Sequence, residues 1–267
     1  MNTRGGTFFR RIDIRFPWLK LVAVCLIGLL AILDLLDLTI SNVTSPFMRA
    51  RLAPMSRHVR MRRDYSDKKL VALTFDDGPS ADTTPRLLDI LFEKDVPATF
   101  FMLGSRARNN PDIVKRAERE YHIVASHTMY HQNLIRISVT AAEADVNESK
   151  EVFKGILGYN SKLTRPPYGN INDTVRKVIG TPLILWSVDS ADWHNQDPNT
   201  ILAIIKSQLH DGAIILMHDI YSTSVDAVPI IIDELRKDGY EFVTVPELAK
   251  ARKINLASGT AYYNFRP

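Results

Sequence analysis

Short apolar runs alternate with longer amphipathic segments from Lys69 onward. The apolar runs contain many β-branched and aromatic residues, which is typical of buried strands; they lie at residues 71–75, 98–103, 122–126, 163–167, 183–188, 213–218 and 241–245. Between them the spacing predicts helices near residues 84–94, 111–120, 140–157, 172–179, 199–210 and 224–238, and a last helix from about Pro246. Pro85, Pro111 and Pro198 lie where three of these helices begin, a position that tolerates proline.

About seven strands, nearly all followed by a helix, predict an α/β fold with a parallel sheet, either open or closed into a barrel. In such sheets function gathers at the carboxyl ends of the strands. Polar and aromatic residues do collect at the predicted strand ends, namely Asp76, Asp77, His127, His131, Arg165, Tyr168, Asp189, Asp192, Trp193 and His218. A random scatter of polar residues would not give this pattern, so we expect one functional site at that edge of the sheet.

A different pattern precedes the predicted domain. Residues 21–33 form a run of thirteen uncharged, mostly apolar residues, shorter than the roughly 20 needed to span a bilayer. The wider window 16–40 is long enough, and its three charges, Lys20, Asp34 and Asp37, can lie at headgroup level. Because no small-x-small cleavage site follows, we expect a membrane anchor or uncleaved signal at 16–40; an amphipathic soluble helix is the alternative. Basic residues flank both ends of the run, so charge does not decide its orientation.

Charge is distributed unevenly along the chain, whose net charge is +4. Eleven of the 34 Lys and Arg residues precede residue 64, against three acidic residues, leaving 23 basic and 27 acidic residues in the body. The body therefore carries a net negative charge, and no nucleic-acid partner is expected. The single cysteine, Cys25, lies in the apolar run and excludes both an intramolecular disulfide and a multi-cysteine zinc site.

Two adjacent acids, Asp76 and Asp77, end the first predicted strand in VALTFDDGPS, residues 71–80. A solvated acidic turn is one interpretation, but a turn at Gly78-Pro79 needs at most one carboxylate. The other interpretation is that each acid has its own role. One acid would bind a metal ion, and its neighbour would take a proton from water activated by that ion.

The spacing of His127 and His131 lets two imidazoles reach one metal ion from a helical turn or a tight loop, although surface histidines often share this spacing. Together with one carboxylate they make a ligand set that suits zinc or another divalent first-row ion. Arg165 is a suitable partner to keep the second carboxylate ionised. His218 is a candidate general acid, with a core histidine in an apolar strand as the alternative.

Five short motifs, TFDDGP, HTxxH, RPPYG, DxxDW and LxH, occur in this order between residues 74 and 218. In this combination the chain resembles the polysaccharide deacetylases, carbohydrate esterase family four (the NodB homology domain), over roughly residues 69–250. The resemblance implies a distorted (β/α) barrel. The expected organisation is a basic cytoplasmic N-terminus at 1–15, the anchor at 16–40, a basic stalk at 41–68, the catalytic domain at 69–252 and a C-terminal tail at 253–267.

The resemblance also implies roles for the site residues. Asp76 would be the catalytic base, oriented by Arg165, and the metal ligands would be Asp77, His127 and His131. The backbone N–H of Tyr168 would stabilise the oxyanion, and Asp192 would tune His218, the acid. Trp193 and Leu216 would line a pocket for the acetyl methyl group, with ordinary core packing as the alternative, while Asp189 is expected to be structural. Ala125, Ser126 and Gln132 depart from the common pattern around the second motif, which leaves the loop shape open.

The implied reaction is the hydrolysis of N-acetyl groups on a glycan, with Zn²⁺ as the expected ion and Co²⁺ or another first-row ion as alternatives. With a membrane anchor, the expected substrate is N-acetylglucosamine of bacterial peptidoglycan. The expected location is the bacterial cell membrane, single-pass with the catalytic domain outside the cytoplasm, or secreted if the segment is cleaved. Alternatives are chitooligosaccharides, N-acetylmuramic acid or an O-acetylated glycan as substrate, an inactive wall-binding module, or a membrane-tethered structural protein.

Overall fold

The computed structural model describes residue 65 and residues 67–267. The segments expected as the basic N-terminus (1–15) and membrane anchor (16–40), and most of the expected stalk (41–68), lie outside the described residues. Within the part of the chain that is described, no helix combines the length and the apolar character needed to cross a membrane.

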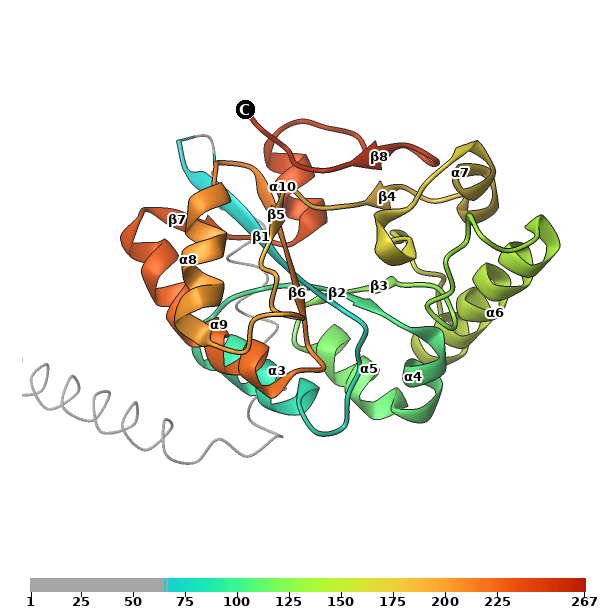
Figure 1. Ribbon diagram of the computed structural model, residues 1–267, viewed down its shortest axis with the longest axis horizontal. Coiled ribbons are helices and arrows are strands. Elements are labelled where there is room, and N and C mark those ends of the chain that lie inside the picture. The colour runs from blue at the N-terminus through green and yellow to red at the C-terminus, as the bar shows by residue number, and fades with distance from the viewer. Residues whose placement is uncertain (1–64, 66) are drawn as a thin grey trace, which may run out of the picture. The chain divides into compact units, whose positions relative to one another are not determined.

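A parallel sheet forms the centre of the fold, with its strands in the order β3-β2-β1-β6-β5 and β7 paired to the start of β1. The strands are β1 (Lys69–Asp76), β2 (Thr99–Met102), β3 (Ile123–Ser126), β5 (Val188–Asp189), β6 (Ala213–His218) and β7 (Tyr240–Phe242). In register, Asp76 of β1 lies opposite His218 of β6. The α/β fold and the parallel sheet expected from the sequence are therefore confirmed (Figure 1).

Helices follow most strands, at the places that the spacing predicts to within two residues. They are α3 (Thr84–Glu93), α4 (Gly104–Asn109), α5 (Pro111–Arg119), α6 (Val139–Leu157), α7 (Asp173–Ile179), α8 (Pro198–Gln208), α9 (Ser222–Lys237) and α10 (Val245–Ala251). Proline lies in the first turn of α3, α5 and α8, and the side chain of Ser138 caps α6 by accepting a hydrogen bond from Ala141 N. The exception is α4, which the sequence pattern does not predict because its six residues are too few for an amphipathic period.

Isolated bridges extend the sheet toward a closed ring. Thr164 bridges Ser126 at the end of β3 on one side and Leu183 on the other. Leu183 belongs to β4 (Leu183–Ile184), which pairs with β8 (Ala261–Tyr262), and Asn264 then bridges back to Ala213 in β6. The result is a barrel in which regular pairing covers only part of the circumference. The C-terminal residues thus contain a closing strand.

Three predicted strands differ from the structure. Residues 163–167 form no regular strand, because Pro166 and Pro167 lack the N–H groups that a ladder requires, and the chain instead enters a 3₁₀ turn at Pro167–Gly169. The run 183–188 divides into β4 and β5, since the chain leaves one strand partner for another between them. The last strand, expected at 241–245, ends at Phe242, and α10 begins at Val245.

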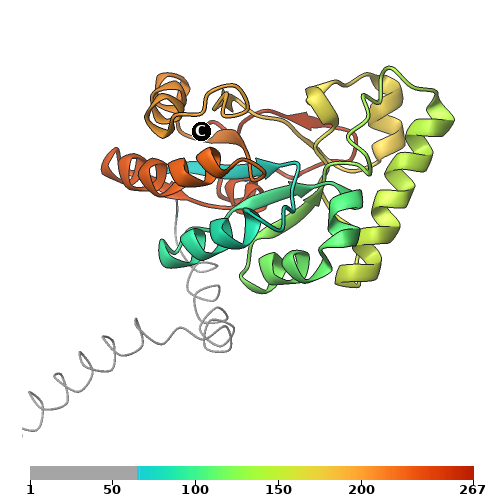
Figure 2. The same ribbon diagram turned by 60° about the horizontal axis from the view of Figure 1, so that its bottom comes forward.

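Alternate residues of β1 pack into two different cores, and this alternation determines which side chains of β1 point toward the inside of the barrel. Val71, Leu73 and Phe75 face the outer core, where the helices α3, α5, α8 and α9 cover the sheet. Figure 2 shows α3 and α9 running side by side along this face. Leu70 and Ala72 face the inner core beneath α10. Because side chains alternate along a strand, the next residues on the inner face are Thr74 and Asp76.

Candidate active site

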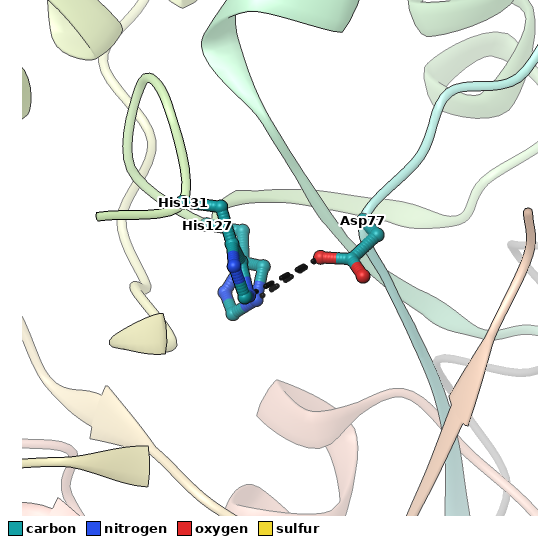
Figure 3. A group of neighbouring side chains, drawn as sticks. All are labelled: Asp77, His127 and His131. Atoms are coloured by element: carbon teal, nitrogen blue, oxygen red, sulfur yellow. Dashed lines mark ion pairs between the residues drawn. The ribbon is translucent and has the colours of Figure 1, made fainter. Parts of the chain in front are cut away.

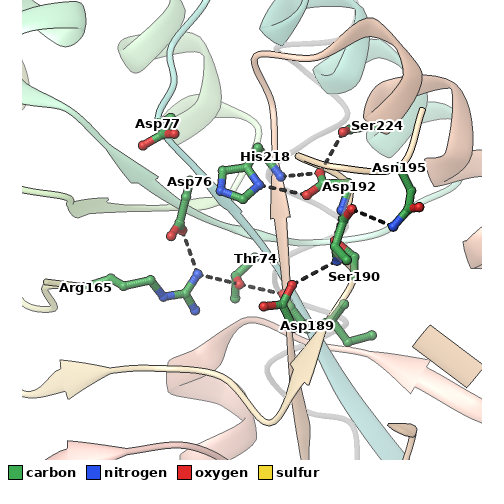
Figure 4. Close-up of polar contacts among 12 residues, drawn as sticks. Thr74, Asp76, Asp77, Arg165, Asp189, Ser190, Asp192, Asn195, His218 and Ser224 are labelled. Atoms are coloured by element: carbon green, nitrogen blue, oxygen red, sulfur yellow. Dashed lines mark hydrogen bonds and ion pairs between the residues drawn. The ribbon is translucent and has the colours of Figure 1, made fainter. Parts of the chain in front are cut away.

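Asp76 and Asp77 diverge although they are neighbours in the chain. Asp76 continues the inner face of β1 and is buried. Asp77 has a left-handed backbone conformation, with φ of 73°, which turns the chain sharply after the strand. Its carboxylate consequently lies apart from that of Asp76 (Figure 4). The two carboxylates therefore point in different directions, although His127 Nε2 lies 3.6 Å from Asp76 Oδ2 and 3.5 Å from Asp77 Oδ1.

Arg165 holds Asp76 in place from across the barrel. Its Nη1 lies 2.6 Å from Asp76 Oδ1 and also donates to Thr74 Oγ1 at 2.9 Å. The Nε and Nη2 groups donate to the carbonyls of Ile184 and Leu185, each at 3.0 Å. These bonds fix the plane of a guanidinium that is 0% exposed. Burial raises the pKa of the Asp76 carboxyl, and the positive charge of Arg165 opposes that rise.

Asp77, His127 and His131 converge on one point (Figure 3). Asp77 Oδ1 lies 3.5 Å from Nε2 of each histidine. The other ring nitrogen of His127, Nδ1, is 2.7 Å from the carbonyl oxygen of Arg165. Nδ1–H therefore donates to that carbonyl, and the lone pair of Nε2 faces Asp77.

The donors present in this group fit a divalent metal ion. Asp77 Oδ1 is buried and has no hydrogen-bond partner within the described part of the chain. Burial lowers the pKa of His127 to about 3, so its imidazole is neutral, as a metal ligand must be. Zinc bonds of about 2.0–2.1 Å in tetrahedral geometry set neighbouring ligand atoms about 3.4 Å apart, close to the spacing seen here. Two imidazoles and one carboxylate leave coordination positions open, as in catalytic sites.

His218 lies at the end of β6, opposite Asp76 in the register of the sheet (Figure 4). Its Nδ1 is 2.8 Å from Asp192 Oδ1, and its backbone N–H donates to Asp192 Oδ2 at 2.7 Å. Ser224 Oγ donates to the same Oδ2 at 2.6 Å. Burial favours the neutral ring, but the hydrogen bond and the charge of Asp192 outweigh it and raise the pKa of His218 to about 9. This histidine is therefore a protonated group at neutral pH, with Nε2–H free to act in the site.

The three expected pocket residues lie in unlike environments. Tyr168 is 60% exposed and has φ of 60°, and its ring lies edge-on to His131 with the centroids 4.7 Å apart. Trp193 is 58% exposed beside His194, so core packing does not account for it. Leu216 is buried on the same face of β6 as His218, two residues away. The structure brings the candidate metal ligands together with Asp76, Arg165 and His218, whereas the exposed Trp193 lies beside His194.

Several polar residues around the site escape the sequence motifs. Ser224, which donates to Asp192, is one of them, whereas Thr74, a partner of Arg165, is the first residue of the TFDDGP motif. Asp219 is fully buried against the Asp77 turn, accepts a hydrogen bond from Thr84 Oγ1 at 2.6 Å, and has a pKa that burial raises to about 7. Asp145 is buried on α6. The one available signal for Asp145 is its place on the apolar face of an amphipathic helix, where an acid is unusual. Asp189, by contrast, accepts from Ala191 N and shapes its own turn, as expected for a structural residue.

A distorted barrel with a His-His-Asp group and a buried carboxylate–guanidinium pair at its strand ends is the framework of a metal-dependent hydrolytic centre. The family model described as polysaccharide deacetylase matches residues 63–181. The chain is 38% identical over 193 residues to a peptidoglycan-N-acetylglucosamine deacetylase of Bacillus cereus (strain ATCC 14579), covering 69% of this chain and 90% of that one. The chain belongs to the polysaccharide deacetylase family.

Two further comparisons define the extent of the likeness. The chain is 42% identical over 187 residues to the peptidoglycan-N-acetylmuramic acid deacetylase PdaC of Bacillus subtilis (strain 168), covering 70% of this chain and 40% of PdaC. The chain thus spans about two fifths of the length of that larger relative. Among solved structures, one described as T48 deacetylase with substrate has a TM-score of 0.71 and 38% identity, covering 75% of this chain and 99% of that one.

Proposed function

We propose that this protein is a metal-dependent hydrolase that removes N-acetyl groups from a glycan, with N-acetylglucosamine of bacterial peptidoglycan as the substrate. The observation that carries the proposal is the division of the acidic pair: Asp76 is bound to Arg165, while Asp77 Oδ1 faces the imidazoles of His127 and His131. A solvated acidic turn would not place one acid in each environment.

Asp77, His127 and His131 would hold the ion, and we propose Zn²⁺ from the nitrogen and oxygen donors present. Bound there, it would polarise the acetamide carbonyl and make water more acidic. Asp76 takes the proton of the attacking water as the bond from oxygen to the carbonyl carbon forms. A raised pKa suits a group that must accept that proton, and Arg165 keeps the accepting oxygen oriented.

The remaining residues act on the tetrahedral intermediate. The backbone N–H of Tyr168 stabilises its negatively charged oxygen. As the C–N bond breaks, His218 Nε2–H protonates the departing amine, and Asp192 holds the imidazolium in position. The products are acetate and a free amine on the sugar. Trp193 and Leu216 bound the space for the acetyl methyl group.

The proposed sugar follows from a relative of which this chain covers 90%. That Bacillus cereus protein is named for N-acetylglucosamine, whereas PdaC is named for N-acetylmuramic acid. The detergent-solubilised full chain, loaded with zinc, is to be incubated with intact peptidoglycan, chitooligosaccharides and acetylated xylan. Acetate release is measured, and mass spectrometry of muramidase fragments identifies the sugar that lost acetyl. Loss of acetyl from N-acetylglucosamine supports the proposal. Loss of acetyl from N-acetylmuramic acid would show that this sugar is the substrate instead, and binding to the wall without acetate release would indicate an inactive binding module.

We further propose that residues 16–40 anchor the protein in the cytoplasmic membrane with the catalytic domain outside. The apolar run and the cell-wall substrate support this arrangement. Protease added to spheroplasts should degrade the catalytic domain but leave intact a control protein that resides in the cytoplasm. Recovery of the whole protein from the culture medium would instead indicate that the segment is cleaved.

A further inference from the structure

The loop His127–His131 does not form a helical turn, although its histidine spacing would allow one. Thr128 and His131 both have left-handed backbone conformations, with φ of 70° and 57°. Such conformations of non-glycine residues cost about 1–3 kcal/mol each and persist only where surrounding contacts enforce them. The contacts that enforce this loop therefore determine where the two imidazoles point.

Three successive amides of this loop are bound by side chains. Met129 N donates to Asp145 Oδ1 at 2.7 Å, and Tyr130 N donates to Asp145 Oδ2 at 3.2 Å. Thr128 N donates to Ser126 Oγ at 3.1 Å, and that hydroxyl lies 3.0 Å from Ser149 Oγ. Asp145 and Ser149 stand one turn apart on the buried face of α6. One helix face thus binds this side of the loop.

The carbonyls of the same loop are bound by the start of α4. Gly104 N donates to the carbonyl of Thr128 at 2.8 Å, and Ser105 N donates to that of Met129 at 3.1 Å. A Cβ on Gly104 would lie 2.6 Å from Met129 Sδ and 3.2 Å from Ser149 Cα, so α4 packs closely against both the loop and α6 at this point. The loop is held between α4 and α6, and Asp145 is its most heavily used side-chain partner.

We propose that Asp145 is a positioning residue of the metal site, which fixes the backbone between His127 and His131 so that both Nε2 atoms face Asp77. The inference rests on the proposed metal-dependent function. Asp145 is 4% exposed, and both of its carboxylate oxygens accept from loop amides. A partner of this kind behind the ligands is typically worth about 10- to 100-fold in metal affinity.

The experiment measures zinc affinity by chelator competition on the purified full chain, with thermal unfolding of the apo-protein recorded in parallel. Asp145→Asn keeps the shape of the side chain but only one acceptor oxygen, so we expect its zinc dissociation constant to rise about 10- to 100-fold. Asp145→Glu retains two acceptors and should bind more tightly than Asp145→Asn. With Co²⁺ as the probe, the absorption bands of Asp145→Asn should shift because the imidazoles are reoriented.

Val146→Ala is the matched control, because it removes a buried apolar group from the same helix without touching the loop amides. It should lower thermal stability and leave zinc affinity at the wild-type value. Equal losses of affinity in Val146→Ala and Asp145→Asn, or wild-type affinity in Asp145→Asn, would overturn the positioning role. Tight zinc binding by the wild-type chain without acetate release would count against the proposed function alone, since the affinity measurement does not use the reaction.

Discussion

Arg165 and Asp76 form an ion pair that is closed to solvent, with Nη1 2.6 Å from Oδ1 and side-chain exposures of 0% and 4%. The two residues are 89 positions apart in the chain. A buried pair of this kind adds little net stability by itself, but removing one partner leaves an uncompensated charge. The pair therefore links the fold of the barrel to the orientation of the Asp76 carboxylate.

The first prediction concerns this pair. Arg165→Met should lower the free energy of unfolding by about 3–5 kcal/mol, because Asp76 is left buried without a counter-charge. The double variant Arg165→Met/Asp76→Asn should recover part of that loss. Arg86→Met, which breaks the exposed pair with Asp226, should cost at most about 1 kcal/mol. Urea denaturation monitored by fluorescence gives all three values, and a loss in Arg165→Met no larger than the exposed control would contradict the argument.

The second prediction separates the base from the ligands. Asp76→Asn should reduce turnover by at least about 100-fold while bound zinc stays stoichiometric, because the amide cannot take the proton of water. Activity is measured as acetate release, and metal content by atomic absorption. A variant that stays fully active would show that Asp76 is not the base.

The third prediction concerns the ligand set. His131→Ala should lose bound zinc and activity together, since one of three protein donors is removed. His194→Ala, an exposed histidine beside Trp193, is the control and should keep its metal. In the wild-type chain, exhaustive chelation should abolish activity and added zinc should restore it. Stoichiometric zinc in His131→Ala would contradict the proposed ligand set of Asp77, His127 and His131.

The fourth prediction is a change in pH dependence. A general acid acts only while protonated, so kcat/KM should fall as the pH rises through the pKa of His218, which is about 9. Asp192→Asn removes the hydrogen bond and the negative charge that raise this pKa, so it should move toward the ordinary value of about 6.5. The basic limb of the profile then shifts to lower pH. The control variant Asp189→Asn should leave the basic limb at its wild-type pH. A pH profile that Asp192→Asn does not change would exclude His218 as the acid.

The fifth prediction tests the closure of the barrel. Gly212 has φ of 81°, and a Cβ there would lie 2.0 Å from the carbonyl oxygen of Phe265. Gly212→Ala should therefore destabilise the protein by about 1–3 kcal/mol. Gly155 lies in α6 with open space around it, so Gly155→Ala should stabilise by about 0.5–1 kcal/mol. Thermal unfolding of the two variants should shift in opposite directions.

The local pattern of apolar and polar residues predicts most of the helices and strands, and it also shows which residue types are available as metal ligands. The strand at 213–218 is found at its predicted bounds, and α9 begins and ends within two residues of its prediction. Both could be predicted because a buried strand or helix face requires apolar residues at a regular spacing in the sequence. The strand predicted at 163–167 is wrong because Pro166 and Pro167 cannot donate to a ladder. β8 has only two residues, too few for any period, and becomes a strand through its partner β4.

The sequence by itself determined the order of strands and helices and the chemistry available at the strand ends, since apolar spacing and side-chain type are local properties. The residues alone did not say which acid has which partner; the family resemblance implied an assignment, and only the tertiary structure supplies the contacts behind it. The pleat of β1 turns Asp76 inward to Arg165, and the left-handed residue after it turns Asp77 toward the histidines. Asp145 likewise gains its place from the packing of α6 against the ligand loop. These relations depend on contacts between segments that are distant in the sequence, and the local spacing of apolar residues carries no information about such contacts.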